Sequence, residues 1–221
     1  MLLLVEQLLN GLQLGIMLFL MSAGLTLVFG IMQVINLAHG SFYMIGAYVG
    51  ATVTAGTGSF LLGLLAALPA AALAGMLVEM LVLRRLYSRD HLDQVLATFG
   101  LIMFFNELTR ILWGRQPLFM DVPRWLSGSI ELIPGVPYPS YRLAVIAVGI
   151  LVAVLLYLLF TRTRIGMQIR AGASNREMAG ALGVNIRLLY TLVFGLGTLL
   201  AGLAGVMAGP ILAVEAGMGE S

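Results

Sequence analysis

The chain has 221 residues, of which 60% are hydrophobic and 10% are charged, and its mean hydropathy is +1.02. Soluble domains are about half apolar and a quarter charged, so this composition predicts an all-α, polytopic membrane protein. The formal charge of +2 is too small to indicate a nucleic-acid partner, and the absence of cysteine excludes disulfides and thiolate metal sites.

Apolar runs recur along the chain, and each is close to the ~20 residues that a helix needs to cross a ~30 Å hydrocarbon core. No repeat or linker divides them, so we expect a single transmembrane domain over residues 1–221, surrounded by membrane lipid. About six spans are predicted, at residues 8–30, 31–55, 60–83, 92–113, 143–160 and 188–209.

The second apolar segment is interrupted by polar residues, Asn36, His39 and Ser41, together with Gly40. Polar groups at membrane depth persist only where they face protein or a water-filled cavity. A helix that breaks there presents free N–H groups and a partial positive charge, which suit a carboxylate. Asn36, His39, Gly40 and Ser41 are therefore candidate residues of a translocation pathway. Hydrogen bonding between helices is the alternative interpretation.

All 12 basic residues are arginine, so a phosphate-binding loop that requires lysine cannot be present. If ATP drives this protein, another subunit must bind it. Cytoplasmic loops of membrane proteins are enriched in basic residues, so the arginine clusters at 84–89 and 162–187 are predicted to be cytoplasmic. The Pro-rich and aromatic connection at 114–141, the N-terminus and residues 211–221 are then predicted to lie outside.

Glu79 lies near the end of the third predicted span. A charge in mid-membrane costs ~2.5–3.5 kcal/mol on insertion scales, so a proton pathway is one hypothesis for this carboxylate. Arg84 and Arg85 follow about one turn later, and an ion pair with them is the favoured interpretation.

Residues 161–187 form a polar loop between the last two predicted spans, and five of the arginines fall in it. Ser174 and Glu177 have the spacing of a capping box, in which the serine hydroxyl and the glutamate satisfy the first N–H groups of a helix. The pattern predicts a helix that begins at Ser174.

The same helix has an apolar face, because Met178, Ala181 and Leu182 recur at i, i+3 and i+4. Gly183 suits the left-handed residue that ends a helix. A two-turn helix is marginal alone, so we expect it to pack against another protein on the cytoplasmic side.

No Ser/His/Asp set, paired carboxylates or dinucleotide fingerprint can be assembled, so no catalytic residue is predicted. A zinc site is disfavoured, because His91 is the only other histidine and no acidic partner lies at ligand spacing from His39. A secondary transporter or channel remains the alternative to an ATP-driven system. It needs a titratable or ion-coordinating centre at mid-membrane, which only His39 could begin.

Two stretches resemble a known family. Residues 24–48, GLTLVFGIMQVINLAHGSFYMIGAY, are similar to the signature of the H-type permease subunits of branched-chain amino acid ABC importers. Residues 177–184, EMAGALGV, resemble the Glu-Ala-Ala loop of ABC importer permeases, with Met178 in place of the usual alanine. The resemblance extends to about residue 210. Because family members continue for further spans, we expect this chain to be a C-terminally incomplete form of an eight-span permease.

The resemblance implies a multi-pass subunit of the bacterial inner membrane that carries branched-chain or related amino acids from periplasm to cytoplasm. Its partners would be a homologous M-type permease, two cytoplasmic ATP-binding subunits and a periplasmic substrate-binding protein. ATP and Mg²⁺ would be bound by those ATPase subunits, and this chain would hold no cofactor or metal and would not be an enzyme. Same-family permeases for urea or short amides are the alternative.

Coupling to the ATPase would use a helix over residues 174–183. The resemblance assigns docking to Glu177, Ala179 and Gly183, and the apolar face adds further residues. The complete set of candidate coupling residues is Ser174, Glu177, Met178, Ala179, Leu182 and Gly183.

Overall fold

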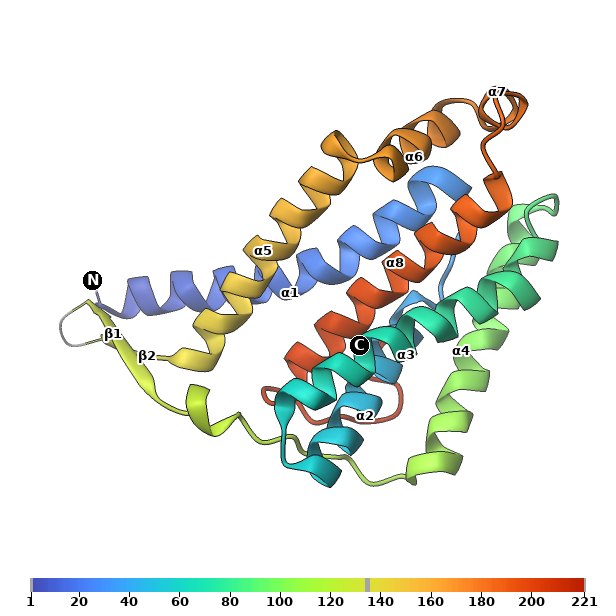
Figure 1. Cartoon of the computed structure of the whole chain (residues 1–221). Coiled ribbons are helices and arrows are strands. Elements are labelled where there is room, and N and C mark those ends of the chain that lie inside the picture. The colour runs from blue at the N-terminus through green and yellow to red at the C-terminus, as the bar shows by residue number, and fades with distance from the viewer. Residues whose placement is uncertain (1, 134–135, 221) are drawn as a thin grey trace.

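The computed structural model describes residues 2–133 and 136–220 and consists mainly of helices (Figure 1). One short two-stranded antiparallel sheet lies in the connection between the fourth and fifth long helices. The elements are α1 (Leu2–Met32), α2 (His39–Thr57), α3 (Phe60–Leu81), η1 (Leu83–Arg85), α4 (His91–Trp113), η2 (Arg124–Leu126), β1 (Ser129–Ile133), β2 (Val136–Pro139), α5 (Ser140–Arg162), α6 (Arg164–Ser174), α7 (Arg176–Ala181) and α8 (Ile186–Ala208).

Helix α8 is the centre of the bundle and packs against α1, α2 and α3. Its glycines and alanines allow neighbouring backbones to approach closely, which is how helices associate in lipid. A Cβ atom on Gly24 of α1 would lie only 3.2 Å from the carbonyl carbon of Gly197. On Gly205, it would lie 2.9 Å from the carbonyl carbon of Tyr43 in α2. The small residues of α8 therefore bring α1 and α2 into backbone contact with it.

Five helices among the described residues are long and apolar enough to cross a membrane: α1, α3 with η1, α4, α5 and α8. They match five of the six predicted spans, although α1 begins six residues earlier than expected. The remaining predicted span, at residues 31–55, corresponds to helix α2, whose sequence is more polar. Most of its first half is buried, so it does not need the lipid-compatible composition of the outer helices.

The outer faces of α1, α4 and α5 are covered with exposed apolar side chains, for example Leu8, Leu96 and Leu155. An apolar surface of this extent is incompatible with water and matches the hydrocarbon core. The chain is therefore a multi-pass membrane protein.

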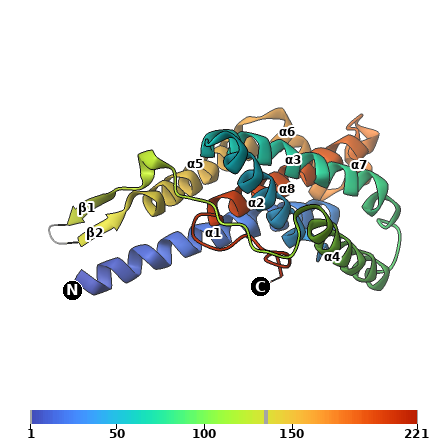
Figure 2. The same ribbon diagram turned by 90° about the horizontal axis from the view of Figure 1, so that it is seen from below.

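The two arginine-rich segments lie at one end of the bundle. Figure 1 shows α6 and α7 at the same end as the connection between α3 and α4. The N-terminal end of α1 and the β1–β2 hairpin lie at the opposite end, and Figure 2 shows them side by side. The buried Tyr138 hydroxyl of β2 donates a hydrogen bond to Asn10 of α1 (3.2 Å), which anchors the hairpin. This bond attaches the predicted external connection to α1. Pro134 and Gly135 lie outside the described residues.

The segment after α8 turns back along α2 instead of leaving the bundle. Leu118 and Val214 exchange backbone hydrogen bonds of 2.8 and 2.9 Å. Farther on, the backbone of Gly219 packs against that of Gly40, and the Asn106 amide of α4 donates to Glu220. Only glycine fits at both positions, because a Cβ atom on either residue would overlap the backbone of the other. The placement of residues 211–221 on the outside stays a prediction, and Ser221 lies outside the described residues.

Candidate functional site

The polar loop at 161–187 contains two helices, α6 and α7, where the sequence predicted one. Thr163 begins α6, because its hydroxyl accepts a hydrogen bond from the Gly166 N–H (3.0 Å). The buried residues of α6 include Ile169 and Gly172, and α6 contacts α1, α5 and α8. Helix α6 therefore packs on the end of the bundle and connects it to α7 (Figure 1).

The predicted capping box is wrong. Ser174 is the last residue of α6, so its own N–H lies within a helix and is not free to be capped. Asn175 is the N-cap of α7, and its side-chain oxygen accepts from the Met178 N–H (2.9 Å). The reason is tertiary: α6 extends to Ser174 because its apolar residues pack on the bundle, and this moves the start of α7 by one residue.

The C-terminal end of α7 confirms the prediction for Gly183. This residue has a φ of 91°, in the left-handed region, and Leu182 is the C-cap. The Gly183 N–H donates to the Gly180 carbonyl (3.0 Å), and the Val184 N–H donates to the Ala179 carbonyl (3.1 Å). These two bonds are those of a Schellman motif, which terminates helices at glycine.

Helix α7 presents two large apolar side chains to solvent. Met178 is 60% exposed and Leu182 is 79% exposed, whereas Ala179 is buried against the rest of the chain. Glu177 is also exposed and has no ion pair within the described ranges. Of the six predicted coupling residues, Ser174, Glu177, Met178, Leu182 and Gly183 are thus accessible, and Ala179 positions the helix.

The interruption predicted inside the second apolar segment is present but begins earlier than expected, so Asn36 lies in it and His39, Gly40 and Ser41 form the first turn of α2. Residues 33–38 are not helical, and Gln33 has a φ of 53°, which is unusual for a residue other than glycine. Gln94 of α4 supports this segment, because its side-chain oxygen accepts from the Ile35 N–H (3.4 Å). Its amide nitrogen donates to the carbonyls of Leu86 and Arg89 (3.2 and 3.3 Å), which ties the break to the α3–α4 connection.

The four candidate pathway residues lie at the end of this break, but they do not share one surface. Asn36, His39 and Gly40 line a cavity of about 410 Å³ beside α1. Ser41 is buried and does not line it. The structure therefore brings three of the four predicted residues together.

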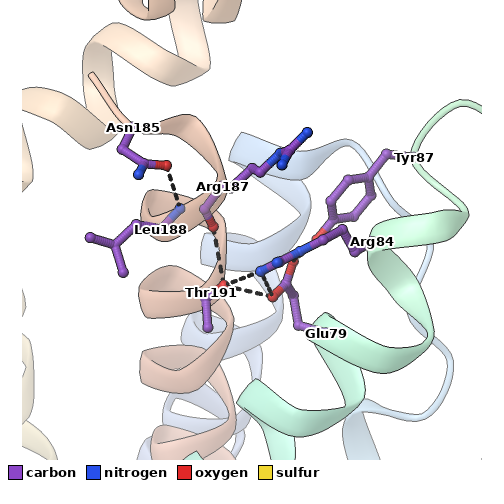
Figure 3. Close-up of polar contacts among 7 residues, drawn as sticks. All are labelled: Glu79, Arg84, Tyr87, Asn185, Arg187, Leu188 and Thr191. Carbon is purple, nitrogen blue, oxygen red and sulfur yellow. Dashed lines mark hydrogen bonds and ion pairs between the residues drawn. The ribbon is translucent and has the colours of Figure 1, made fainter. Parts of the chain in front are cut away.

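A second polar cluster, which the sequence revealed only in part, joins α3 to α8 at the arginine-rich end (Figure 3). The fully buried Glu79 carboxylate accepts from Arg84 Nη2 (2.9 Å) and from the Tyr87 hydroxyl (2.6 Å). The Thr191 hydroxyl of α8 donates to Glu79 Oε2 (2.7 Å) and accepts from Arg84 Nη2 (2.7 Å). The favoured ion pair between Glu79 and Arg84 is confirmed.

Burial and the hydrogen bond to Glu79 raise the pKa of the Tyr87 phenol above its ordinary value, so the phenol remains a donor. Arg84, Tyr87 and Thr191 all donate to Glu79, which is therefore the common acceptor of this cluster. Thr191 was missed in the sequence because it is 112 residues from Glu79. Tyr87 is only eight residues from Glu79, but the chain turns between them and no helical spacing links the two. No group of three His, Asp or Glu side chains that could hold a metal occurs in the described part of the chain.

Comparison with known proteins gives one family. Residues 7–219 match the family described as "Branched-chain amino acid transport system / permease component". BraD of Pseudomonas aeruginosa, a high-affinity branched-chain amino acid transport system permease protein, is 30% identical over 92% of this chain and 70% of its own length. The LivH permease proteins of Salmonella typhimurium and Escherichia coli K12 are 30% and 29% identical, over 95% of this chain and 71% of their own lengths.

No solved structure gives a significant match. The family match nevertheless covers nearly the whole chain, including α7, the break before α2 and the Glu79 cluster. The chain belongs to the family of permease components of branched-chain amino acid transport systems.

Proposed function

We propose that this chain is the transmembrane permease subunit of a bacterial ABC importer. It would carry branched-chain or related amino acids across the inner membrane from periplasm to cytoplasm. The chain would not itself be an enzyme, because ATP and Mg²⁺ would be bound by two cytoplasmic ATPase subunits. A homologous M-type permease would complete the membrane part, and a periplasmic binding protein would deliver the substrate. Membership of the family and the names of the relatives support this proposal.

The observation that carries the proposal is the exposed face of α7. A six-residue helix cannot stand alone, and this one is held by the Asn175 cap and by the Schellman motif at Gly183. Its two large apolar side chains, Met178 and Leu182, nevertheless remain in solvent. Exposed apolar side chains on a rigid, short helix are suited to a groove on a partner.

We assign α7 to docking on the ATPase, with Glu177, Met178 and Leu182 in contact with its surface. The position of these three side chains is set by Ser174 and Gly183, which flank α7, and by its buried Ala179. Closure of the ATPase dimer would push α7 and therefore move α5 and α8, the helices that flank the loop.

The Glu79 cluster extends this movement to a third helix. Thr191 lies in the second turn of α8, and its hydrogen bonds attach that turn to Glu79 and Arg84 at the end of α3. A displacement of α7 would therefore move α3 together with α8. Asn36, His39, Gly40 and Ser41 are proposed to belong to the pathway that this movement opens.

The docking role can be tested with two matched methionines. Met178 on α7 and Met167 on α6 are both 60% exposed and lie in the same loop. We expect Met178→Glu to abolish copurification of the ATPase subunits and uptake of leucine in proteoliposomes, because a charge in an apolar groove is unpaired. Met167→Glu should retain both.

Retention of binding and uptake in Met178→Glu would refute docking through α7. Equal loss in both variants would show that the loop acts as a whole and not through this face. If the native chain binds no ATPase and instead takes up leucine with a proton gradient, the protein is a secondary transporter.

A further inference from the structure

Asn36 and His39 are buried polar residues without hydrogen-bond partners. Asn36 is 5% exposed and His39 is 3% exposed. The amide nitrogen and oxygen of Asn36 make no hydrogen bond to any described residue. Both ring nitrogens of His39 lack a hydrogen bond of standard geometry, although the Met21 backbone lies beside the ring. Buried side-chain polar atoms are nearly always hydrogen-bonded, because a buried polar atom without a hydrogen bond destabilises the protein. Four such atoms at one place therefore point to a ligand.

Both residues line the cavity beside α1, whose other walls are mainly apolar but include Ser22 and Gly219. The cavity of about 410 Å³ is within the ~300–1,000 Å³ range of small-molecule sites. Its apolar walls include Leu18 and Leu25 of α1 and Leu37 of the break. No charged side chain of the described residues lines it. The cavity thus has one polar end and one aliphatic side.

The start of α2 adds a third polar group to this end. Gly40, in the first turn of α2, lines the cavity, and no side chain caps the helix, since Ala38 stands at its N-cap. The first N–H groups of a helix carry a partial positive charge and attract anions. Together with the unpartnered Asn36 and His39, they provide donors for a carboxylate.

The cavity lies beside the middle of α8. His39 packs against Gly24 of α1, where a Cβ atom would lie 3.0 Å from His39 Nε2 and 3.2 Å from the Gly197 carbonyl carbon. Gly197 is the central residue of α8, which runs from Ile186 to Ala208. Substrate sites near the bilayer midplane, at broken helices, are a recurring arrangement in transporters.

We propose that this cavity is a substrate site that binds the backbone end of an aliphatic α-amino acid. The carboxylate lies at the start of α2 and accepts hydrogen bonds from the Asn36 amide and from the helix N–H groups. The ammonium group donates to the Asn36 oxygen and to the unprotonated nitrogen of His39. The aliphatic side chain lies against Leu18, Leu25 and Leu37. This inference rests on the proposed function and names the place where that function binds its cargo.

The donors and acceptors match a zwitterion. Asn36 offers two donors and one acceptor, and a neutral imidazole offers one of each. A urea or short amide would use the polar end but leave the apolar wall unfilled. An amino acid with a charged side chain would bring a second charge against leucines, which is unfavourable without a partner. The geometry therefore favours aliphatic amino acids.

The first test measures uptake and ATP hydrolysis of the assembled transporter in proteoliposomes. Asn36→Leu keeps the approximate size of the side chain and removes its polar atoms. We expect leucine uptake to fall about tenfold, which corresponds to about 1.4 kcal/mol, while subunit assembly and ATP hydrolysis persist. Thr54→Val is the matched control, because it also removes a buried, unpartnered oxygen from α2 but lies outside this cavity, and uptake should be unchanged.

The second test does not depend on transport. The chain has no cysteine, so Leu25→Cys and Leu192→Cys each introduce a single thiol into it, at positions that are both 40% exposed. We expect leucine, but not glutamate, to slow alkylation of the thiol introduced by Leu25→Cys. Alkylation at Leu192→Cys, outside the cavity, should not respond.

Unchanged uptake in Asn36→Leu, or no protection of the thiol introduced by Leu25→Cys, would overturn the site. Loss of the partner permease from Asn36→Leu preparations would also overturn it, because the polar atoms would then bind a subunit and not the substrate. A native complex that takes up no leucine at all would instead refute the proposed function, so the two failures are distinguishable.

Discussion

A close contact between α2 and α8 predicts effects of opposite sign for alanine substitutions at two glycines of α2. Gly46 and Gly56 both lie in α2. A Cβ atom on Gly46 would lie 2.8 Å from the carbonyl carbon and 2.5 Å from the carbonyl oxygen of Gly202 in α8. A Cβ atom on Gly56 would meet nothing within 4 Å. Gly46→Ala should therefore destabilise the protein, and Gly56→Ala should stabilise it.

The magnitude follows from the contact. Carbon atoms pack best at ~3.5–4.0 Å, so at Gly46 the new methyl group would require α2 and α8 to separate by roughly 1 Å. The obstacle at Gly202 is backbone and cannot rotate away. Overpacking of this kind costs ~1–3 kcal/mol, and we expect the upper part of that range. The higher helix propensity of alanine returns ~1 kcal/mol, which leaves about 2 kcal/mol of net destabilisation.

At Gly56 only the propensity gain remains, up to ~1 kcal/mol. For a chain of this size, 1 kcal/mol corresponds to a shift in melting temperature of about 2–4 °C. Gly46→Ala should therefore melt about 4–8 °C lower than the native chain, and Gly56→Ala up to about 4 °C higher.

Thermal unfolding of the detergent-purified chain measures both effects through tryptophan fluorescence. Trp113 is a suitable reporter of α2, because its ring lies 5.0 Å from that of Tyr48 and its Nε1 donates to Thr52 (2.7 Å). An unchanged or higher melting temperature for Gly46→Ala would refute the close contact between α2 and α8. A similar decrease in Gly56→Ala would show a general intolerance of α2 and not a steric effect.

Three further predictions follow from the arginine-rich end and the loop. Glu79→Gln should lower the free energy of unfolding by ~2 kcal/mol in the same melting assay, because it replaces one acceptor oxygen with an amide donor. Breaking a fully buried pair costs ~3–5 kcal/mol, and we expect a smaller loss because Arg84 is 34% exposed. An unchanged melting temperature would contradict the clustered hydrogen bonds. Thiols introduced by Leu182→Cys and Ser127→Cys should be alkylated by a membrane-impermeant maleimide from opposite sides of the membrane. The thiol introduced by Leu182→Cys should react only from the cytoplasm. Labelling of both thiols from one side would refute the predicted topology. Gly183→Ala should weaken ATPase copurification, because a φ of 91° costs an alanine ~1–2 kcal/mol. Gly180→Ala, at a relaxed helical glycine of α7, is the control. The same loss in this control would show that the Schellman motif is not the cause.

The sequence by itself determined the class of the protein and the approximate position of its long helices. Long apolar runs predict membrane spans, because the thickness of the bilayer sets the number of apolar residues that a crossing helix needs. Gly183 could be assigned from sequence because the end of a helix is a local feature that depends on one left-handed residue. The break before α2 was also predictable, since Asn36 and His39 are out of place in an apolar segment.

Only the tertiary structure decided which polar groups meet. The capping assignment moved from Ser174 to Asn175 because α6 is stabilised by packing on the bundle, a long-range effect that a four-residue motif does not contain. The contact between Glu79 and Thr191 joins helices 112 residues apart. The unpartnered atoms of Asn36 and His39 became visible only once every neighbour was in place. A local sequence pattern indicates secondary-structure propensity and hydrophobicity. Which polar side chains meet across the bundle depends on how the helices pack, and a short stretch of sequence does not contain that information.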